Sequence, residues 1–190
     1  MTSSDVERWS PLKVWLYSLL NRSPKSNLEI VRFAGVGETD RFLDVGCGPG
    51  AALEHASATG ARVAGVDPSS SMVARAKKRV PEAEVEVGSA EDIPFPDHTF
   101  TVAINVSSFH HWADRDAGLR EIARVLAPGA RLHIVEGRLD DDGHGHGLGM
   151  NDAQVLTERL GELGYTEMRI DTLRTGRRHE YLVVSAVNPS

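Results

Sequence analysis

The sequence contains a single cysteine, Cys47, which excludes an internal disulfide bond. One thiol in 190 residues is typical of a reducing compartment, so we expect a cytoplasmic protein. No run of about 18 apolar residues occurs, so no transmembrane helix and no membrane partner are expected. The N-terminal residues include Asp5 and Glu7 and no apolar stretch, so no signal peptide is expected.

Positive charge is also scarce. The 21 Lys and Arg residues and 27 Asp and Glu residues give a formal net charge of −6. Binding to a phosphate backbone needs clustered Lys and Arg side chains, so we expect no nucleic-acid partner. The two densest basic groups are interpreted as a solvated helix face at residues 75–79 and a turn between strands at residues 174–178.

Alternating strand and helix patterns fill the chain after residue 40. Short strands are predicted at residues 41–45, 62–66, 84–87, 100–105 and 131–135, interspersed with helices at 51–58, 69–80 and 114–126. Pro128 and Gly129 are predicted to turn the chain into the fifth of these strands. Strands that alternate with helices form a parallel sheet with right-handed crossovers.

Asn151 is predicted to cap a further helix, which is followed by a hairpin of strands at 167–173 and 180–187. The predicted fold is therefore α/β. It is a Rossmann-like, doubly wound, seven-stranded and mostly parallel sheet with an antiparallel C-terminal hairpin strand.

Two extra helices are predicted before the first strand. Ser10 and Pro11 begin one of them, and Ser26, with Glu29 three residues on, begins the other. These helices either cover the mouth of a pocket or pack on the sheet. We expect a single domain over residues 1–190, with a helical cap segment at 1–39 and an α/β core at 40–190.

A glycine-rich turn at Gly46, Gly48 and Gly50 follows the first strand and precedes a helix. Glycines let the backbone approach a ligand closely, and a helix N-terminus offers unpaired N–H groups. The spacing differs from the G-x-G-x-x-G pattern of dinucleotide sites. Asp67 ends the second strand, 21 residues after Gly46 (67 − 46), where a carboxylate can accept hydrogen bonds from ribose hydroxyls. The alternative is a helix-capping aspartate before Pro68. Turn and acid together predict an adenosine-containing ligand.

Four longer motifs resemble those of the class I S-adenosylmethionine-dependent methyltransferases, especially the small-molecule, ubiquinone/menaquinone-type group (methyltransferase type 11). They lie at residues 43–50, at 63–69 together with Met72, at 88–95 and at 125–132, in the order and spacing of that family. The resemblance runs from about residue 40 to residue 136. It implies S-adenosylmethionine as the cofactor and methyl transfer to a small organic acceptor by direct displacement.

The same resemblance implies roles by position. The glycine-rich turn lies against the methionyl part of the cofactor, Asp44 orients the turn or the amino group, and Asp67 holds the ribose. Met72, Ala90 and Glu91 border the adenine, although Met72 is alternatively a core residue and Glu91 a helix-capping acid. The full predicted cofactor-binding set is Asp44, Gly46, Cys47, Gly48, Gly50, Asp67, Pro68, Met72, Ala90, Glu91, Asn105 and Val106.

The candidates for a general base are His110 and His111, which follow the fourth strand. The alternative is that one histidine braces the loop while Trp112 packs in the core. No resident metal is predicted. The residues at 140–146 hold carboxylates and imidazoles that suit a divalent metal, but so glycine-rich a segment is also typical of a solvated loop.

Two other function classes stay open on the sequence alone. One is a non-catalytic binding module with a methyltransferase-like fold, and the other is a nicotinamide-dependent oxidoreductase. The resemblance implies that the loop at residues 140–146 forms part of the cover over the acceptor. This loop is short here, so the acceptor site is either shallow or completed by a second subunit in a homodimer.

Overall fold

The computed structural model describes residues 24–139, 147–176 and 179–189. Its strands are β1 (Arg41–Val45), β2 (Arg62–Asp67), β3 (Glu84–Val87), β4 (Phe100–Val106), β5 (Leu126–Gly137), β6 (Thr166–Thr175) and β7 (His179–Val187). Its helices are α2 (Pro24–Phe33), α3 (Ala51–Ser57), α4 (Ser70–Arg79), α5 (Arg115–Val125) and α6 (Met150–Glu162), with a short 3-10 turn, η1 (Phe109–His111).

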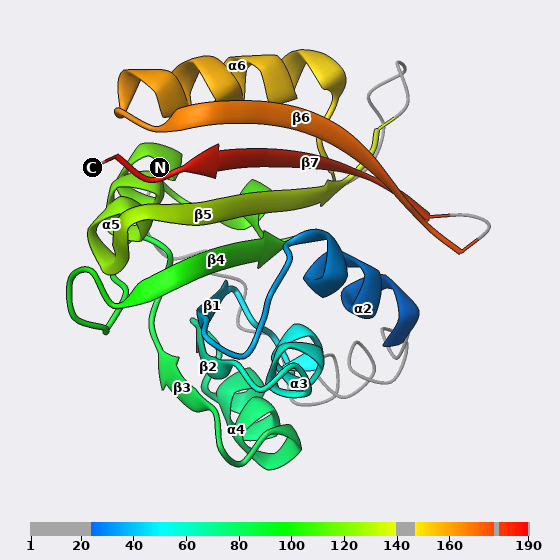
Figure 1. The fold of residues 1–190 in the computed structure, drawn as a ribbon, viewed down its shortest axis with the longest axis vertical. Helices are drawn as coiled ribbons and strands as arrows, with labels where there is room; N and C mark the ends of the chain where they lie inside the picture. Colours follow the sequence, from blue (N-terminus) through cyan, green and yellow to red (C-terminus); the bar gives the residue numbers. More distant parts are fainter. Residues whose placement is uncertain (1–23, 140–146, 177–178, 190) are drawn as a thin grey trace, which may run out of the picture.

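The seven strands form one sheet in the order β3-β2-β1-β4-β5-β7-β6 (Figure 1). Neighbouring strands from β3 to β5 pair in parallel, and β7 runs antiparallel to both β5 and β6. The predicted fold class is therefore confirmed. The strand order reverses direction between β1 and β4, and ligands of such sheets bind at the carboxyl ends of the strands beside that switch point.

Helices cover both faces of the sheet. Ile30, Leu53 and Val73, from α2, α3 and α4, share one buried cluster. Leu119 and Leu156, from α5 and α6, belong to the cluster on the other face. Figure 1 shows α6 lying along β6, while α2, α3 and α4 group at the opposite end of the sheet. Burial on both faces explains why the central parallel strands are apolar nearly throughout.

Helix α2 packs on the sheet, which decides between the two roles predicted for it. Ile30 and Val31 are buried, with 1% and 2% of their surface exposed. The prediction that Ser26 begins this helix was wrong, because α2 begins at Pro24. The Ser26 hydroxyl instead shares a 2.9 Å hydrogen bond with the Thr175 hydroxyl at the end of β6. The helix predicted from Pro11 lies outside the described residues.

Three other boundaries compare with prediction as follows. Asp114 caps α5 as predicted, because its Oδ1 accepts the backbone N–H of Ala117 at 3.0 Å. Helix α6 has Gly149 as its N-cap, so the prediction that Asn151 caps this helix was wrong by two residues. Strand β5 starts at Leu126, so the predicted turn at residues 128–129 is an irregularity within a strand, where Gly129 has φ 74°. Among the described residues, none of the helices has the length and apolarity needed to cross a bilayer.

Candidate functional site

The glycine-rich turn leaves β1 in a backbone conformation that side chains disfavour. Gly46, Gly48 and Gly50 have φ of 78°, 51° and 80°. The N–H groups of Gly46 and Cys47 both donate to the carbonyl of Val66, at 2.8 and 3.0 Å, which ties the turn to β2. A Cβ on Gly48 would meet no described atom within 4 Å, so the backbone there is open to a ligand.

Asp67 joins the end of β2 to this turn. Its Oδ2 accepts the N–H of Gly48 at 2.8 Å, and its Oδ1 accepts the N–H of Ser69 at 2.9 Å. Burial raises the pKa of Asp67, although these two hydrogen bonds lower it. The bond to Ser69 is the local contact that the helix-capping alternative implies, whereas the bond to Gly48 spans two strands. Each carboxylate oxygen keeps capacity for a further hydrogen bond.

Asp44 is a buried acid at the same edge of the sheet. Its side chain lies in β1 with 3% of the residue exposed, and within the described part of the chain its Oδ1 has no hydrogen-bond partner. Burial, and next the negative charge of Asp67, raise the pKa of Asp44 to about 8. Burial and both acids also raise the pKa of the Cys47 thiol. An unpaired buried acceptor costs about 1–3 kcal/mol, so a donor or cation from a ligand would be stabilising here.

Asn105 connects the ends of β1 and β4. Its Nδ2 donates to the carbonyl of Val45 at 2.8 Å and to the hydroxyl of Ser108. The residue is fully buried, and its Oδ1 is unpaired as far as the described residues go. Val106 follows as a half-buried residue. Two orphaned oxygens, from Asp44 and Asn105, therefore lie on adjacent strands beside the switch point.

Four predicted cofactor residues remain, and they differ in how far they are buried and in the contacts that they make. Met72 and Ala90 each have 6% of their surface exposed, but only Ala90 belongs to a core cluster of the described residues. Pro68 is exposed. Oε1 of Glu91 accepts the backbone N–H groups of Ala113 and Asp114, at 2.9 and 3.2 Å, just before α5. Burial raises the pKa of Glu91, but hydrogen bonds lower it overall. These hydrogen bonds are the ones expected if Glu91 is a helix-capping acid. Contact between Glu91 and adenine stays a prediction.

The two candidate histidines lie on η1, which follows β4. His110 Nδ1 is 2.9 Å from Oε2 of Glu136, at the end of β5, and the imidazole centroids of His110 and His111 are 4.0 Å apart. The other carboxylate oxygen of Glu136, Oε1, accepts the N–H of Phe109 at 2.8 Å. Trp112 packs edge-on against Phe109, with ring centroids 4.9 Å apart, as the bracing alternative predicts.

Glu136 is a site residue that sequence reasoning missed. It is an acid one residue before the end of β5, much as Asp67 is the last residue of β2, and it is 1% exposed. Applying the strand-end rule to β5 as well as to β2 would have found it.

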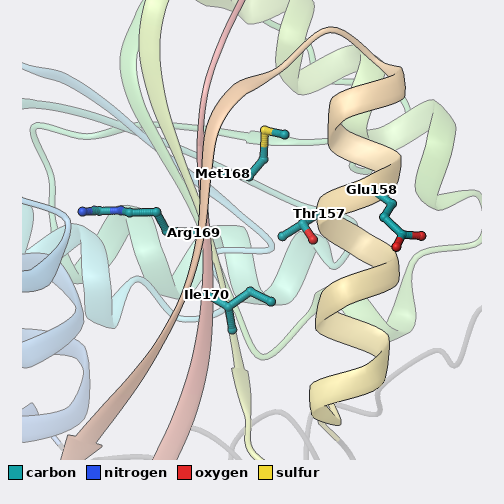
Figure 2. A pocket seen from close by; sticks show the side chains of 5 residues that line it. All are labelled: Thr157, Glu158, Met168, Arg169 and Ile170. Atoms are coloured by element: carbon teal, nitrogen blue, oxygen red, sulfur yellow. The ribbon is translucent and has the colours of Figure 1, made fainter.

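The segment 140–146, considered as a metal loop, lies outside the described residues. A shallow pocket of about 420 Å³ lies between α6 and β6, at the far edge of the sheet from β1. Figure 2 shows Thr157 and Ile170 between the helix and the strand, with Arg169 pointing away from the helix. The residues that line it include none of the predicted site residues.

Residues 43–134 match the family model described as a methyltransferase domain. This part of the chain is therefore similar to a methyltransferase domain. This region is 41% identical over 102 residues to 27-O-demethylrifamycin SV methyltransferase of Amycolatopsis mediterranei, covering 50% of this chain and 38% of that protein. It is 38% identical over 97 residues to demethylmenaquinone methyltransferase of Chlorobaculum parvum, covering 50% and 40%. The chain thus spans about two fifths of the length of these relatives.

Solved methyltransferase structures share the fold of this domain. A SAM-dependent methyltransferase from Aquifex aeolicus superposes with a TM-score of 0.73 at 22% identity, covering 94% of this chain and 98% of that one. Phosphoethanolamine N-methyltransferase 2 of Haemonchus contortus, in complex with phosphomonomethylethanolamine and S-adenosylhomocysteine, gives 0.77 at 18% identity, covering 97% and 58%. The predicted fold is confirmed, and the match over residues 43–134 agrees with the predicted resemblance to methyltransferases.

Proposed function

We propose that this chain binds S-adenosylmethionine at the carboxyl ends of β1, β2 and β4 and transfers its methyl group to a small organic acceptor. The observation that carries the proposal is the junction at Gly48, where the carboxylate of Asp67 accepts the backbone N–H of the glycine-rich turn. Beside this junction lie two buried side-chain oxygens, of Asp44 and Asn105, that have no hydrogen-bond partner among the described residues. The methyltransferase match over residues 43–134 and relatives named for small-molecule methylation support it.

The residues present fit this cofactor chemically. S-adenosylmethionine carries an ammonium group and two ribose hydroxyls. These are donors that the unpaired oxygens of Asp44 and Asn105 lack among the described residues, and that the carboxylate of Asp67 can still accept beside its two backbone hydrogen bonds. Its net positive charge would favour the ionised form of Asp44, whose pKa burial raises to about 8. Open space beside Gly48 allows the backbone to lie against the ligand.

The chain's own contribution is mainly position. When bound, S-adenosylmethionine supplies a methyl group on a positively charged sulfur that leaves readily. The turn after β1 and the Asn105 amide, held by Val45 and Ser108, would fix the methionyl end. Val106 and Met72 would limit the access of water. Fixed alignment of the two reacting groups is worth several kcal/mol, so much of the rate would come from this scaffold.

The proposal also covers the cellular location of the protein and its partners. We place the activity in the cytoplasm, with neither a membrane nor a nucleic acid as partner, in keeping with the acidic composition and single buried thiol. A homodimer that completes the acceptor site stays a prediction.

The first test is titration calorimetry of the chain with S-adenosylmethionine, S-adenosylhomocysteine and NAD. Binding of the first two and not of NAD is expected, and the reverse preference would overturn the proposal in favour of a dehydrogenase. A cell extract incubated with methyl-labelled cofactor then shows turnover by mass spectrometry. Tight binding without a labelled product would instead indicate a non-catalytic module.

A further inference from the structure

The carboxylate of Glu136 makes two different hydrogen bonds. One oxygen accepts the backbone N–H of Phe109 at 2.8 Å, and the other lies 2.9 Å from Nδ1 of His110. The carboxylate is 1% exposed and the His110 side chain 17% exposed. A single buried group thus holds both the backbone of η1 and the imidazole ring that η1 presents.

A loop brace alone does not need the second bond. Burying a carboxylate is costly, and a backbone carbonyl or an amide oxygen would accept the Phe109 N–H at a lower desolvation cost. The Phe109 ring is itself fixed by burial, by Trp112 and by the Arg115 guanidinium 4.9 Å from its centroid. The charged group is therefore explained by what it does to His110.

A carboxylate can only accept from a neutral imidazole. It therefore keeps the proton of neutral His110 on Nδ1 and the lone pair on Nε2, and it stabilises the imidazolium that forms when Nε2 takes a proton. This is how a buried acid prepares a histidine for general-base catalysis. The neighbouring parallel strands β4 and β5 bring the pair to the sheet edge that also carries Asp44 and Asp67.

We propose that Glu136 is a positioning residue that holds His110 as a general base, and that the acceptor is a hydroxyl compound such as a phenol. This inference rests on the proposed function. A hydroxyl keeps its proton at neutral pH, with a phenolic pKa of about 10, so it gains most from a built base. The acceptor oxygen forms a bond to the methyl carbon as the carbon–sulfur bond breaks. The electron pair of that bond goes to sulfur, and the hydroxyl proton goes to Nε2 of His110 and then to solvent.

The decisive variant is Glu136→Gln. Its amide oxygen can still accept the Phe109 N–H, so the loop is kept, but its NH₂ group would face Nδ1 of His110. That donor forces the opposite tautomer, with the lone pair on Nδ1 and the proton on Nε2. Glu162→Gln, which removes a surface carboxylate from α6, is the matched control.

Histidine ¹⁵N spectra of the full chain report the tautomer without any acceptor. A His110→Gln variant identifies the signals. We expect Nδ1–H in the parent and in Glu162→Gln, and Nε2–H in Glu136→Gln. An Nε2–H tautomer in the parent, or no change in Glu136→Gln, would overturn the positioning role.

The acceptor class is tested with unsubstituted catechol, whose hydroxyls keep their protons at neutral pH, and with thiophenol, which ionises without help. We expect Glu136→Gln to slow methylation of the catechol about 100-fold or more, the usual contribution of a general base, and to change thiol methylation less than threefold. Equal loss on both probes, or methylation of the thiol alone by the parent, would overturn the hydroxyl assignment. S-adenosylhomocysteine titration keeps the inferences separate, since failure to bind refutes the proposed function and leaves the tautomer result standing.

Discussion

Oδ2 of Asp67 and the backbone nitrogen of Gly48 are joined by a 2.8 Å hydrogen bond that connects the end of β2 to the turn after β1. The bond makes one carboxylate responsible both for the shape of the turn and for presenting acceptors to a ligand. Its neighbours Asp44 and Cys47 are buried, whereas Gly48 itself is only partly buried and is open on the side where a ligand would lie.

Replacement of Asp67 by alanine should weaken cofactor binding. A ribose hydroxyl would lose its acceptor and the Gly48 N–H would lose its anchor, at a cost of about 1–3 kcal/mol, or roughly 5- to 150-fold in Kd. Titration calorimetry with S-adenosylhomocysteine measures the change. Asp97→Ala, which removes an exposed partner of Arg124, is the control and should bind as the parent does. Unchanged affinity in Asp67→Ala would remove this residue from the site.

Gly46→Ala and Gly129→Ala separate a steric clash from backbone strain. Both glycines have positive φ, 78° and 74°, so each substitution should cost about 1–2 kcal/mol. A Cβ on Gly46 would also lie 2.1 Å from Oγ of Ser108, whereas one on Gly129 meets no described atom within 4 Å. We expect Gly46→Ala to lose about 1–3 kcal/mol more in urea unfolding. Equal losses would show that the turn after β1 relaxes freely.

Asp44 should make the ligand-free protein less stable as pH rises. Its pKa is about 8 in the folded state against 3.8 unfolded, so between these values the folded state binds more protons. Stability attributable to this group is therefore highest below about pH 4 and falls toward pH 8, by at most about 1.4 kcal/mol per pH unit. Urea unfolding of the parent and of Asp44→Asn at several pH values checks this. The variant should gain on the parent as pH rises, and parallel curves would contradict it.

His133 should have the opposite effect. Burial, and then the charges of Arg131 and Arg169, lower its pKa to about 4, and its Nδ1 lies 2.9 Å from Oγ of Ser185. The unfolded chain, with a value of 6.5, takes up the proton first, so stability from this group is present above pH 6.5 and is lost toward pH 4.

The same unfolding series measures the contribution of His133. In His133→Asn, the fall in stability between pH 6.5 and 4 should be smaller than in the parent. Phe33 of α2 lies edge-on to the His133 ring, at 5.9 Å between centroids. In the parent, the hydrogen-exchange protection of α2 should therefore also fall as the pH is lowered from 6.5 to 4. If the stability of His133→Asn falls between pH 6.5 and 4 as much as that of the parent, groups other than His133 cause the fall.

How far sequence reasoning reached depended on the range of the interaction. Strand ends were predicted within a few residues, because buried parallel strands are continuous apolar runs and their ends carry Gly or Asp. The cap at Asp114 is a contact between residues three apart, and it too was predicted correctly. Ser26 was misassigned because its partner, Thr175, lies 149 residues away.

The sequence by itself determined the order of the elements, the glycine-rich turn and the acid at the end of β2, since these follow from local periodicity and backbone sterics. Only the tertiary structure decided that Glu136 faces His110 and that Asn105 bridges β1 and β4. Those contacts depend on which strands are neighbours and in what register. That arrangement comes from packing the whole sheet between its helices, and no short stretch of residues encodes it.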